Sequence, residues 1–165
     1  MSEKVIVSMG SFNPPHKGHF EMFDEILKVH EKFHLFVRYN EGIDLTSREV
    51  KEKWFDRISA EYDNRIIIHV FTMEDMKGKD YDPHIFAGAI RFFESQLGEV
   101  IDEVWTGEDA APLFEGMDKE FPNTKFILTK RCGITSTAIR SDIEGHKDCM
   151  PDYVYEDLIR ITRGE

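Results

Sequence analysis

Apolar positions along the chain follow two alternating patterns. β-Branched and aromatic residues cluster over the length of a strand in five runs, residues 5–9, 33–39, 65–71, 101–107 and 124–130. Between these runs, apolar residues recur every three or four positions, which predicts helices over residues 19–33, 47–62, 83–98, 110–121, 135–145 and 151–163. Ser47 is expected to cap the second helix, and Pro83 and Gly98 to open and close the third.

The alternation of strands and helices predicts the fold class. Parallel strands that are joined by helical crossovers form a sheet with helices on both faces. The most economical arrangement is an α/β fold with a doubly wound, Rossmann-like parallel sheet of strand order 3-2-1-4-5. In that order the winding reverses between the first and fourth strands, and ligands bind beyond the carboxyl ends of the strands at such a reversal. The loop after residue 9 and the segment 106–110 should therefore face each other across a binding crevice.

Composition and charge limit what the protein can be. The 165 residues are 41% hydrophobic, which fits a single domain over residues 1–165. A net charge of −11 argues against nucleic acid as a partner, because nucleic-acid binding needs a basic face. No apolar run reaches the roughly 20 residues of a membrane span, and the first residues lack the pattern of a signal peptide. We therefore expect a cytoplasmic protein without a membrane partner.

Two cysteines, Cys132 and Cys149, lie 17 residues apart. This number and spacing provide neither a disulfide framework nor a zinc ligand set. The chemistry of the protein is therefore sought in other residues, above all where a few cations and backbone amides gather and could bind an anion.

The loop after the first strand carries the most distinctive residues of the chain, GSFNPPHKGHF over residues 10–20. Gly10 lets the backbone turn sharply, and Pro14 and Pro15 end the strand and stiffen the loop. The next helix is expected to begin near residues 17–19. Its free N–H groups and the positive end of its dipole would then point into the crevice.

Two histidines in this loop, His16 and His19, lie three residues apart and so belong to one helical turn. Gly18 leaves room for a bulky anion close to the backbone. Two imidazoles, a helix N-terminus and this clearance indicate a pocket for phosphate. Two other interpretations stay open at this point: an ordinary capped loop, or two ligands of a zinc ion that lacks a third ligand in the motif.

A second polar segment follows the last strand. Thr135, Ser136 and Thr137 bring hydroxyl groups to the start of a predicted helix, and Arg140 follows one turn later. A guanidinium group can reach the same anion with a planar fork of donors. The same pattern also occurs at helix caps that bind nothing.

Both segments resemble signatures of one superfamily. His16-Lys17-Gly18-His19 resembles the H-x-G-H signature of the nucleotidyltransferases, and the longer stretch GSFNPPHKGH is most similar to the nicotinamide and nicotinate mononucleotide adenylyltransferases. The segment ITSTAIR, residues 134–140, resembles the second signature of that family, I-S-S-T-x-I-R, with Thr135 where serine is more usual. The two motifs frame the five strand-like runs in the expected order, and the resemblance covers nearly the whole chain, more weakly in its middle.

The resemblance implies a reaction and a set of site residues. The 5′-phosphate of a pyridine mononucleotide would attack the α-phosphate of ATP and release pyrophosphate, as a step of NAD synthesis. Mg²⁺ would accompany ATP, bound mainly by phosphates and water and without a protein metal site. The implied catalytic residues are His16, His19 and Arg140. The implied ATP-binding residues are Gly10, Ser11, Phe12, Gly18, Gly107, Asp109, Thr135, Ser136 and Thr137.

The acceptor mononucleotide needs an aromatic platform for its ring and a cation for its phosphate. By residue type the candidates are Arg38, Arg48, Trp54 and Trp105. Arg38 ends the second strand and so lies on the ligand side of the sheet, whereas a buried tryptophan is more often a core residue. The nicotinate-type enzymes usually carry a Ser-Tyr-Thr segment where this chain has DYDPHIFAG, residues 80–88. The choice between an acid and an amide acceptor is therefore open.

Other functions are compatible with parts of this pattern. Phosphopantetheine adenylyltransferases match in length but usually have threonine at the position of His16, and small cytidylyltransferases usually have a different C-terminal signature. A nucleotide sensor without turnover would not need His16, His19 and Arg140 together. A dinucleotide-dependent dehydrogenase is disfavoured because G-x-G-x-x-G is absent after the first strand. By family analogy, the chain could form a homo-oligomer.

Overall fold

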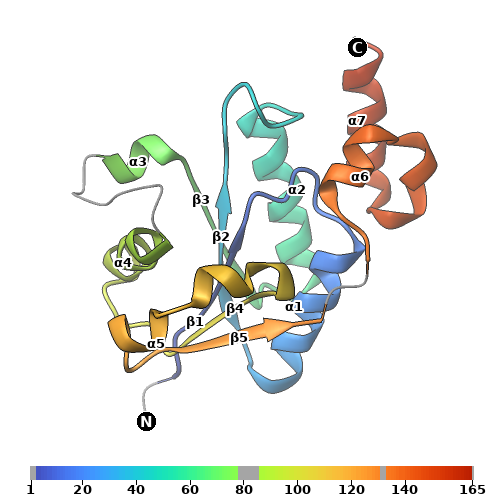
Figure 1. Ribbon diagram of the computed structural model, residues 1–165. Coiled ribbons are helices and arrows are strands. Elements are labelled where there is room, and N and C mark those ends of the chain that lie inside the picture. Colours follow the sequence, from blue (N-terminus) through green and yellow to red (C-terminus); the bar gives the residue numbers. More distant parts are fainter. Residues whose placement is uncertain (1–2, 78–85, 131–132, 165) are drawn as a thin grey trace.

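The computed structural model describes residues 3–77, 86–130 and 133–164 (Figure 1). Its strands are β1 (Ile6–Gly10), β2 (Phe33–Arg38), β3 (Ile66–Phe71), β4 (Glu103–Gly107) and β5 (Lys125–Thr129). Its α-helices are α1 (Lys17–Val29), α2 (Arg48–Glu61), α3 (Met73–Lys77), α4 (Phe86–Leu97), α5 (Met117–Glu120), α6 (Ser136–Ser141) and α7 (Asp152–Thr162). Two 3₁₀ helices, η1 (Glu108–Phe114) and η2 (Glu144–Cys149), complete the described elements.

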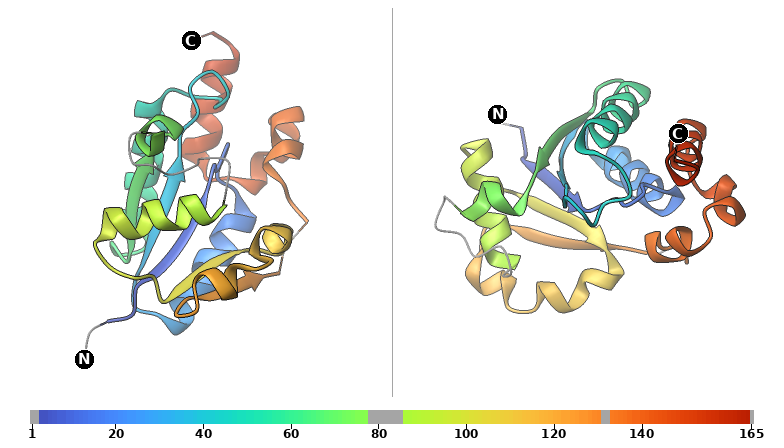
Figure 2. Two further views of the ribbon diagram at one scale, coloured as in Figure 1. Left: turned by 60° about the vertical axis from the view of Figure 1, so that its left-hand side comes forward. Right: turned by 90° about the horizontal axis from the view of Figure 1, so that it is seen from above.

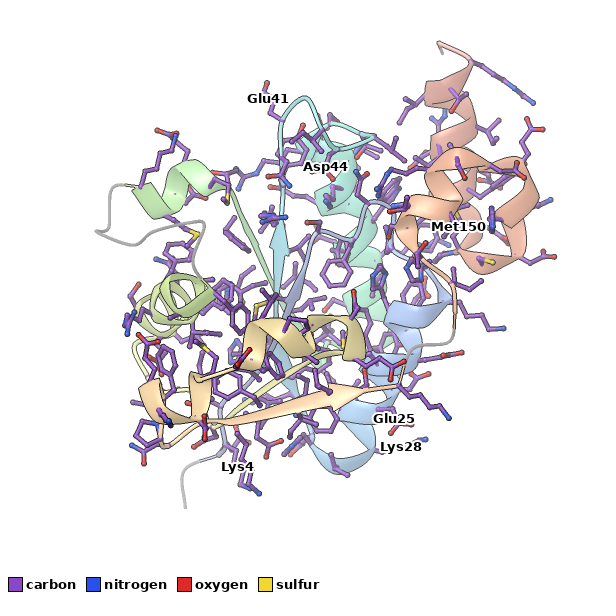
Figure 3. The ribbon with its side chains drawn as sticks, viewed as in Figure 1. Lys4, Glu25, Lys28, Glu41, Asp44 and Met150 are labelled. Atoms are coloured by element: carbon purple, nitrogen blue, oxygen red, sulfur yellow. The ribbon has the colours of Figure 1, made fainter. Side chains whose placement is uncertain are left out.

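The five strands form one parallel sheet in the order β3-β2-β1-β4-β5, which confirms the predicted topology. In a parallel sheet all carboxyl ends of the strands lie at the same edge. Figure 3 shows Glu41 and Asp44, in the loop that follows β2, at the top of the molecule and Lys4, which precedes β1, at the bottom. The reversal of winding falls between β1 and β4, as expected.

Helices cover both faces of the sheet, and the alternation of side chains along each strand explains the two cores (Figures 1 and 2). In β1, Ile6 faces the core beneath α1, α2 and α7, and Val7 faces the core beneath α4. In β2, Leu35 and Phe36 divide in the same way. Strands that are buried on both faces read as continuous apolar runs, which is why these strands were predictable from sequence.

Helix ends follow local chemistry. Ser47 caps α2 as predicted, with its Oγ accepting a hydrogen bond from the Val50 N–H at 3.3 Å. The helix predicted over residues 110–121 is instead divided into η1 and α5, because Gly116 adopts a left-handed conformation with φ of 80°. The helix predicted over residues 135–145 ends at Ser141, and α3 was not predicted. Pro83 and Cys132 lie outside the described residues. None of the described helices has both the length and the apolar character that crossing a membrane requires.

Two histidines form a pair between β2 and β3. His34 Nδ1 and His69 Nε2 are 2.9 Å apart, and the His69 ring stacks on Phe36 with centroids 4.6 Å apart. Burial lowers the pKa of both imidazoles, and the charge of Lys32 lowers the pKa of His34 further. The folded state therefore disfavours protonation of this pair. The unfolded chain takes up these protons near pH 6.5, so the pair favours unfolding as the pH falls below about 6.5.

We expect the free energy of unfolding to fall more steeply with acidification in the wild type than in a His34→Gln/His69→Gln double variant. Urea unfolding at about pH 7.5 and about pH 5.5, followed by circular dichroism, measures the difference. All carboxylates and the other histidines are common to both proteins, so their contributions cancel in the comparison. Equal losses in the two proteins would contradict the assignment of this pH dependence to the pair.

Candidate active site

A cavity of about 460 Å³ lies at the carboxyl ends of β1 and β4, where the winding of the sheet reverses. Its volume is in the range of small-molecule sites. The polar residues in its lining are Ser11, Asn13, His19, Arg38, Thr106, Asp109, Thr129, Lys130, Ser136 and Arg140. The large apolar residues are Met9, Phe12, Met22, Phe71, Met73, Met76, Phe86, Phe93 and Leu113.

The loop after β1 is anchored in the core by Phe12. The Phe12 ring is 3% exposed and packs against Phe23 and Phe55, with ring centroids 6.0 and 5.3 Å away. Phe12 adopts a positive φ of 46°, and a Cβ on Gly10 would lie 3.0 Å from its Cζ. Glycine at position 10 therefore lets the aromatic ring fold back beneath the strand end. Gly10, Ser11 and Phe12 all line the cavity, as the backbone roles predicted for them require.

The side chains of His16 and His19 both accept hydrogen bonds from backbone N–H groups at the start of α1. The Gly18 N–H donates to His16 Nδ1, and the His16 N–H donates to His19 Nδ1, both at 3.0 Å. This is a capping box in which imidazoles replace the usual hydroxyl and carboxylate. Because each Nδ1 accepts a hydrogen bond, the proton of each neutral imidazole resides on Nε2. The Nε2 of His19 is therefore a donor without any need for a charged ring.

The two histidines differ in their access to the cavity. His19 lines the cavity, whereas His16 is fully buried behind it, with the two ring centroids 3.8 Å apart. The geometry makes His16 the support of His19. Direct contact of His16 with a nucleotide phosphate stays a prediction.

Residues from α6 bind the first loop directly. Ser136 Oγ donates to the Pro14 carbonyl at 3.0 Å, and Arg140 Nη1 donates to the Asn13 carbonyl at 2.7 Å. The partners in the first of these bonds are 122 residues apart in the chain. The second sequence motif thus lies against the first, and both Ser136 and Arg140 line the cavity.

The remaining hydroxyls of the second motif act within α6. Thr135 Oγ1 caps the helix by accepting from the Ala138 N–H at 3.0 Å. Thr137 Oγ1 accepts from Arg140 Nη2 at 3.1 Å and so orients the guanidinium group. Neither threonine lines the cavity, so their predicted contacts with ATP have no support from position.

The segment after β4 forms the opposite wall. Thr106, Gly107 and Asp109 line the cavity, and Asp109 belongs to the first turn of η1. The position agrees with the prediction that this segment faces the loop after β1. The predicted contact of Asp109 with ribose hydroxyls is not tested by the structure.

Arg38 reaches the cavity from the end of β2. Its Nη2 donates to Ser11 Oγ at 3.0 Å, and the residue lines both the main cavity and a second hollow of about 300 Å³. Arg140 and Asn13 also line both. Of the four acceptor-binding candidates, Arg38 is the one that the described cavity lining includes.

The other three acceptor-binding candidates lie elsewhere. Trp54 is 3% exposed in the core and donates from Nε1 to Asp157 Oδ2 at 2.8 Å. Trp105 is 9% exposed and donates from Nε1 to Glu103 Oε1 at 2.9 Å. Arg48 sits on the surface of α2 and pairs with Glu52. The structure brings none of these three side chains to the cavity.

Several lining residues were not singled out from the sequence. Most of the apolar ones come from β3, α3 and α4, among them Phe71, Met76 and Phe93, and their residue types are those of an ordinary core. Asn13 and Lys130 also line the cavity. The one available signal was position, because Met9, Phe71 and Lys130 lie at or just beyond the carboxyl ends of strands.

The cavity is locally positive in an acidic protein. Among its described lining residues, Arg38, Lys130 and Arg140 are cations and Asp109 is the single carboxylate, while the whole chain carries −11. Such a gathering attracts anionic ligands to a cleft. Together with the helix start at α1 and the donor on His19, it fits a polyphosphate.

No protein-family model and no curated protein matches this sequence. Solved structures of similar fold include a bifunctional NMN adenylyltransferase/ADP ribose pyrophosphatase from Francisella tularensis, with a TM-score of 0.69 at 13% identity over 98% of this chain. NadR protein in complex with NR gives 0.60 at 15% identity over 93% of this chain. A protein of Vibrio parahaemolyticus assigned as a nicotinate-nucleotide adenylyltransferase gives 0.65 at 15% identity over 96%.

The share of each neighbour that is matched differs. This chain spans 50% of the Francisella protein and 46% of NadR, and 92% of the Vibrio protein. At such low identity the likeness establishes the fold alone, and the substrates have to be inferred from the residues of the site. The chain has a Rossmann-like fold that it shares with these solved structures.

Proposed function

We propose that this protein is an adenylyltransferase that joins the AMP moiety of ATP to a pyridine mononucleotide and releases pyrophosphate. The observation that carries the proposal is the meeting of two distant motifs at one cavity. Ser136 and Arg140 donate hydrogen bonds to the carbonyls of Pro14 and Asn13, and His19 lines the same cavity. The fold neighbours with adenylyltransferase names support the same reaction class.

The reaction suits a site that has no activated nucleophile. An oxygen of the acceptor phosphate forms a bond to the α-phosphorus of ATP. The bond from this phosphorus to the oxygen that bridges the α- and β-phosphates breaks, and pyrophosphate leaves with the electron pair. Both the attacking and the leaving group are anionic phosphates, so no proton has to be removed. Catalysis then depends on positioning and on donors that stabilise the developing charge.

The polar residues divide this work. In the proposal, His19 donates from Nε2 to the α-phosphate, and His16 holds the imidazole in place through the capping box. Arg140 and Ser136 hold the β- and γ-phosphates that leave as pyrophosphate. Asp109 is the single carboxylate among the described lining residues, and no group of three possible ligands occurs in the described part of the chain. This donor set fits Mg²⁺ that is carried by the phosphates of ATP, where it would neutralise their charge.

The acceptor fits the region between Arg38 and the apolar wall. Arg38 lines the cavity and would pair with the mononucleotide phosphate. The partly buried Phe86 offers aromatic surface in the same cavity, whereas Phe71 and Phe93 are buried behind it. A pyridine ring attached to ribose carries a positive charge, which aromatic faces attract. In the proposal, Phe86 takes the platform role that was predicted for the two tryptophans.

The proposal predicts pyrophosphate release when the protein is mixed with Mg²⁺, ATP and nicotinamide mononucleotide or nicotinate mononucleotide. Mass spectrometry should identify a dinucleotide as the product and decide between the amide and the acid. His19→Ala protein purified in the same way controls for contaminating enzymes. If pyrophosphate is released only when phosphopantetheine is the acceptor, or only when CTP takes the place of ATP, the protein is another transferase and the proposal is wrong. ATP binding without turnover of any acceptor would indicate a sensor.

A further inference from the structure

A lysine and an aspartate are buried together behind the cavity wall. Lys51 projects from α2 with a side chain that is 1% exposed, and the Asp44 side chain is 2% exposed. The Lys51 ammonium donates to the Asp44 carboxylate, to the Ser11 carbonyl and to the Arg38 carbonyl, the last at 3.0 Å. An ammonium has three donors, so each of them has an acceptor.

The three acceptors belong to three different segments. Ser11 follows β1, Arg38 ends β2, and Asp44 lies in the loop after β2, near the top of the molecule in Figure 3. All three line the second hollow, and Ser11 and Arg38 also line the main cavity. Asp44 in turn accepts from the Asn40 N–H at 2.6 Å. Lys51 therefore connects the backbones of the segments that present Ser11 and Arg38.

A buried ion pair is by itself weak evidence for a role in the stability of the fold. Burial lowers the pKa of Lys51, and the hydrogen bond and charge of Asp44 oppose that shift. Both charges lose their water, and replacement of a buried ion pair by well-packed apolar residues is often neutral or stabilising. The contacts of Lys51 with segments that line the cavity instead point to a role of the pair in the geometry of the site.

We propose that Lys51 and Asp44 are positioning residues that hold Arg38 and Ser11 in the arrangement that binds the phosphate of the acceptor. This inference rests on the proposed function. Lys51 is too buried to touch a ligand and acts through two backbone carbonyls and one carboxylate. Arg140 and Ser136, which the proposal assigns to the leaving phosphates of ATP, are held by other bonds, to the Asn13 and Pro14 carbonyls, and the Ser11 hydroxyl accepts from Arg38. Loss of the pair should therefore impair the acceptor more than ATP.

The kinetic test compares Lys51→Met, Asp44→Asn and the double variant, in which neither charge is left buried alone. The expected result for the double variant is a KM for the acceptor raised at least about tenfold, the scale of one lost hydrogen bond to a charged group. The KM for ATP should stay within about twofold. Lys53→Met is the matched control, because Lys53 lies on the same helix, is 74% exposed and pairs with Glu49. Equal rises in both KM values in a folded double variant would overturn the inference.

Amide hydrogen exchange tests the positioning without any turnover. The N–H groups of Asn40 and Leu45, which donate to Asp44 and Asn13, should exchange faster in the double variant than in Lys53→Met. Unchanged exchange at both amides would refute the positioning role even if the enzyme is active. Absence of turnover in the wild type would instead refute the proposed function, and the exchange rates would still decide whether the pair holds the loop.

Discussion

Replacement of His19 by alanine is expected to lower kcat at least about 10²-fold, the order seen when one donor to a transition state is lost. The physical reason is the capping box at the start of α1. The His16 N–H donates to His19 Nδ1, which leaves the proton of the neutral ring on Nε2. His19 lines the cavity, where charge would develop on the α-phosphate in the proposed reaction.

A second variant separates catalysis from helix capping. His19→Gln can still accept from the His16 N–H, as glutamine does in ordinary capping boxes, whereas His19→Ala loses about 1 kcal/mol of cap stability. We expect both variants to lose kcat and kcat/KM in parallel, which is the pattern of an interaction made only in the transition state. Steady-state kinetics and urea unfolding of both variants measure the two effects. A folded His19→Ala protein with kcat near the wild-type value would remove His19 from the proposed role.

Arg140→Ala is expected to lower kcat/KM for ATP by about 10²-fold, because hydrogen bonds from a guanidinium to phosphate oxygens are among the strongest in proteins. Arg140 is held in place by its bonds to the Asn13 carbonyl and to Thr137 Oγ1. The KM for the acceptor should change much less, because Arg38 is assigned to the acceptor phosphate.

Two comparisons make the Arg140 result specific. Arg140→Lys keeps the charge but not the planar fork, so it should fall between the wild type and Arg140→Ala. Arg163→Ala removes an exposed arginine just beyond α7 and should behave as the wild type. If Arg140→Ala weakens ATP and the acceptor equally, Arg140 serves mainly to hold the first loop through Asn13.

Sequence patterns predicted the parts of this protein that depend on neighbouring residues. The five strands were predictable because each is a strand-length run rich in β-branched and aromatic residues, and their order followed from the most economical doubly wound arrangement. Ser47 was predictable as a cap because a hydroxyl satisfies free N–H groups of its own helix. The positions of His19, Ser136 and Arg140 at the cavity followed from their places just beyond β1 and β5.

Tertiary structure alone decided which side chains face the cavity. Trp54 and Trp105 were plausible platforms by residue type, yet the packing of α2 and of β4 turns both rings into the core. His16 stands three residues from His19 and is nevertheless buried, because it caps the helix that presents its neighbour. The sequence gives the chemical type of each side chain, but the elements that pack against it determine its orientation.

Residue type and spacing within single elements are enough to predict the strands of the sheet, their order and the two polar motifs. The apolar wall from β3, α3 and α4 and the buried bond of Lys51 with Asp44 became visible in the folded chain. Those features depend on contacts between segments far apart in the chain. A methionine among core residues and a lysine on a polar helix look ordinary in the sequence, so neither could be predicted to have such a role. The packing of distant segments thus brings residues that look ordinary in the sequence to the lining of the cavity or directly behind it.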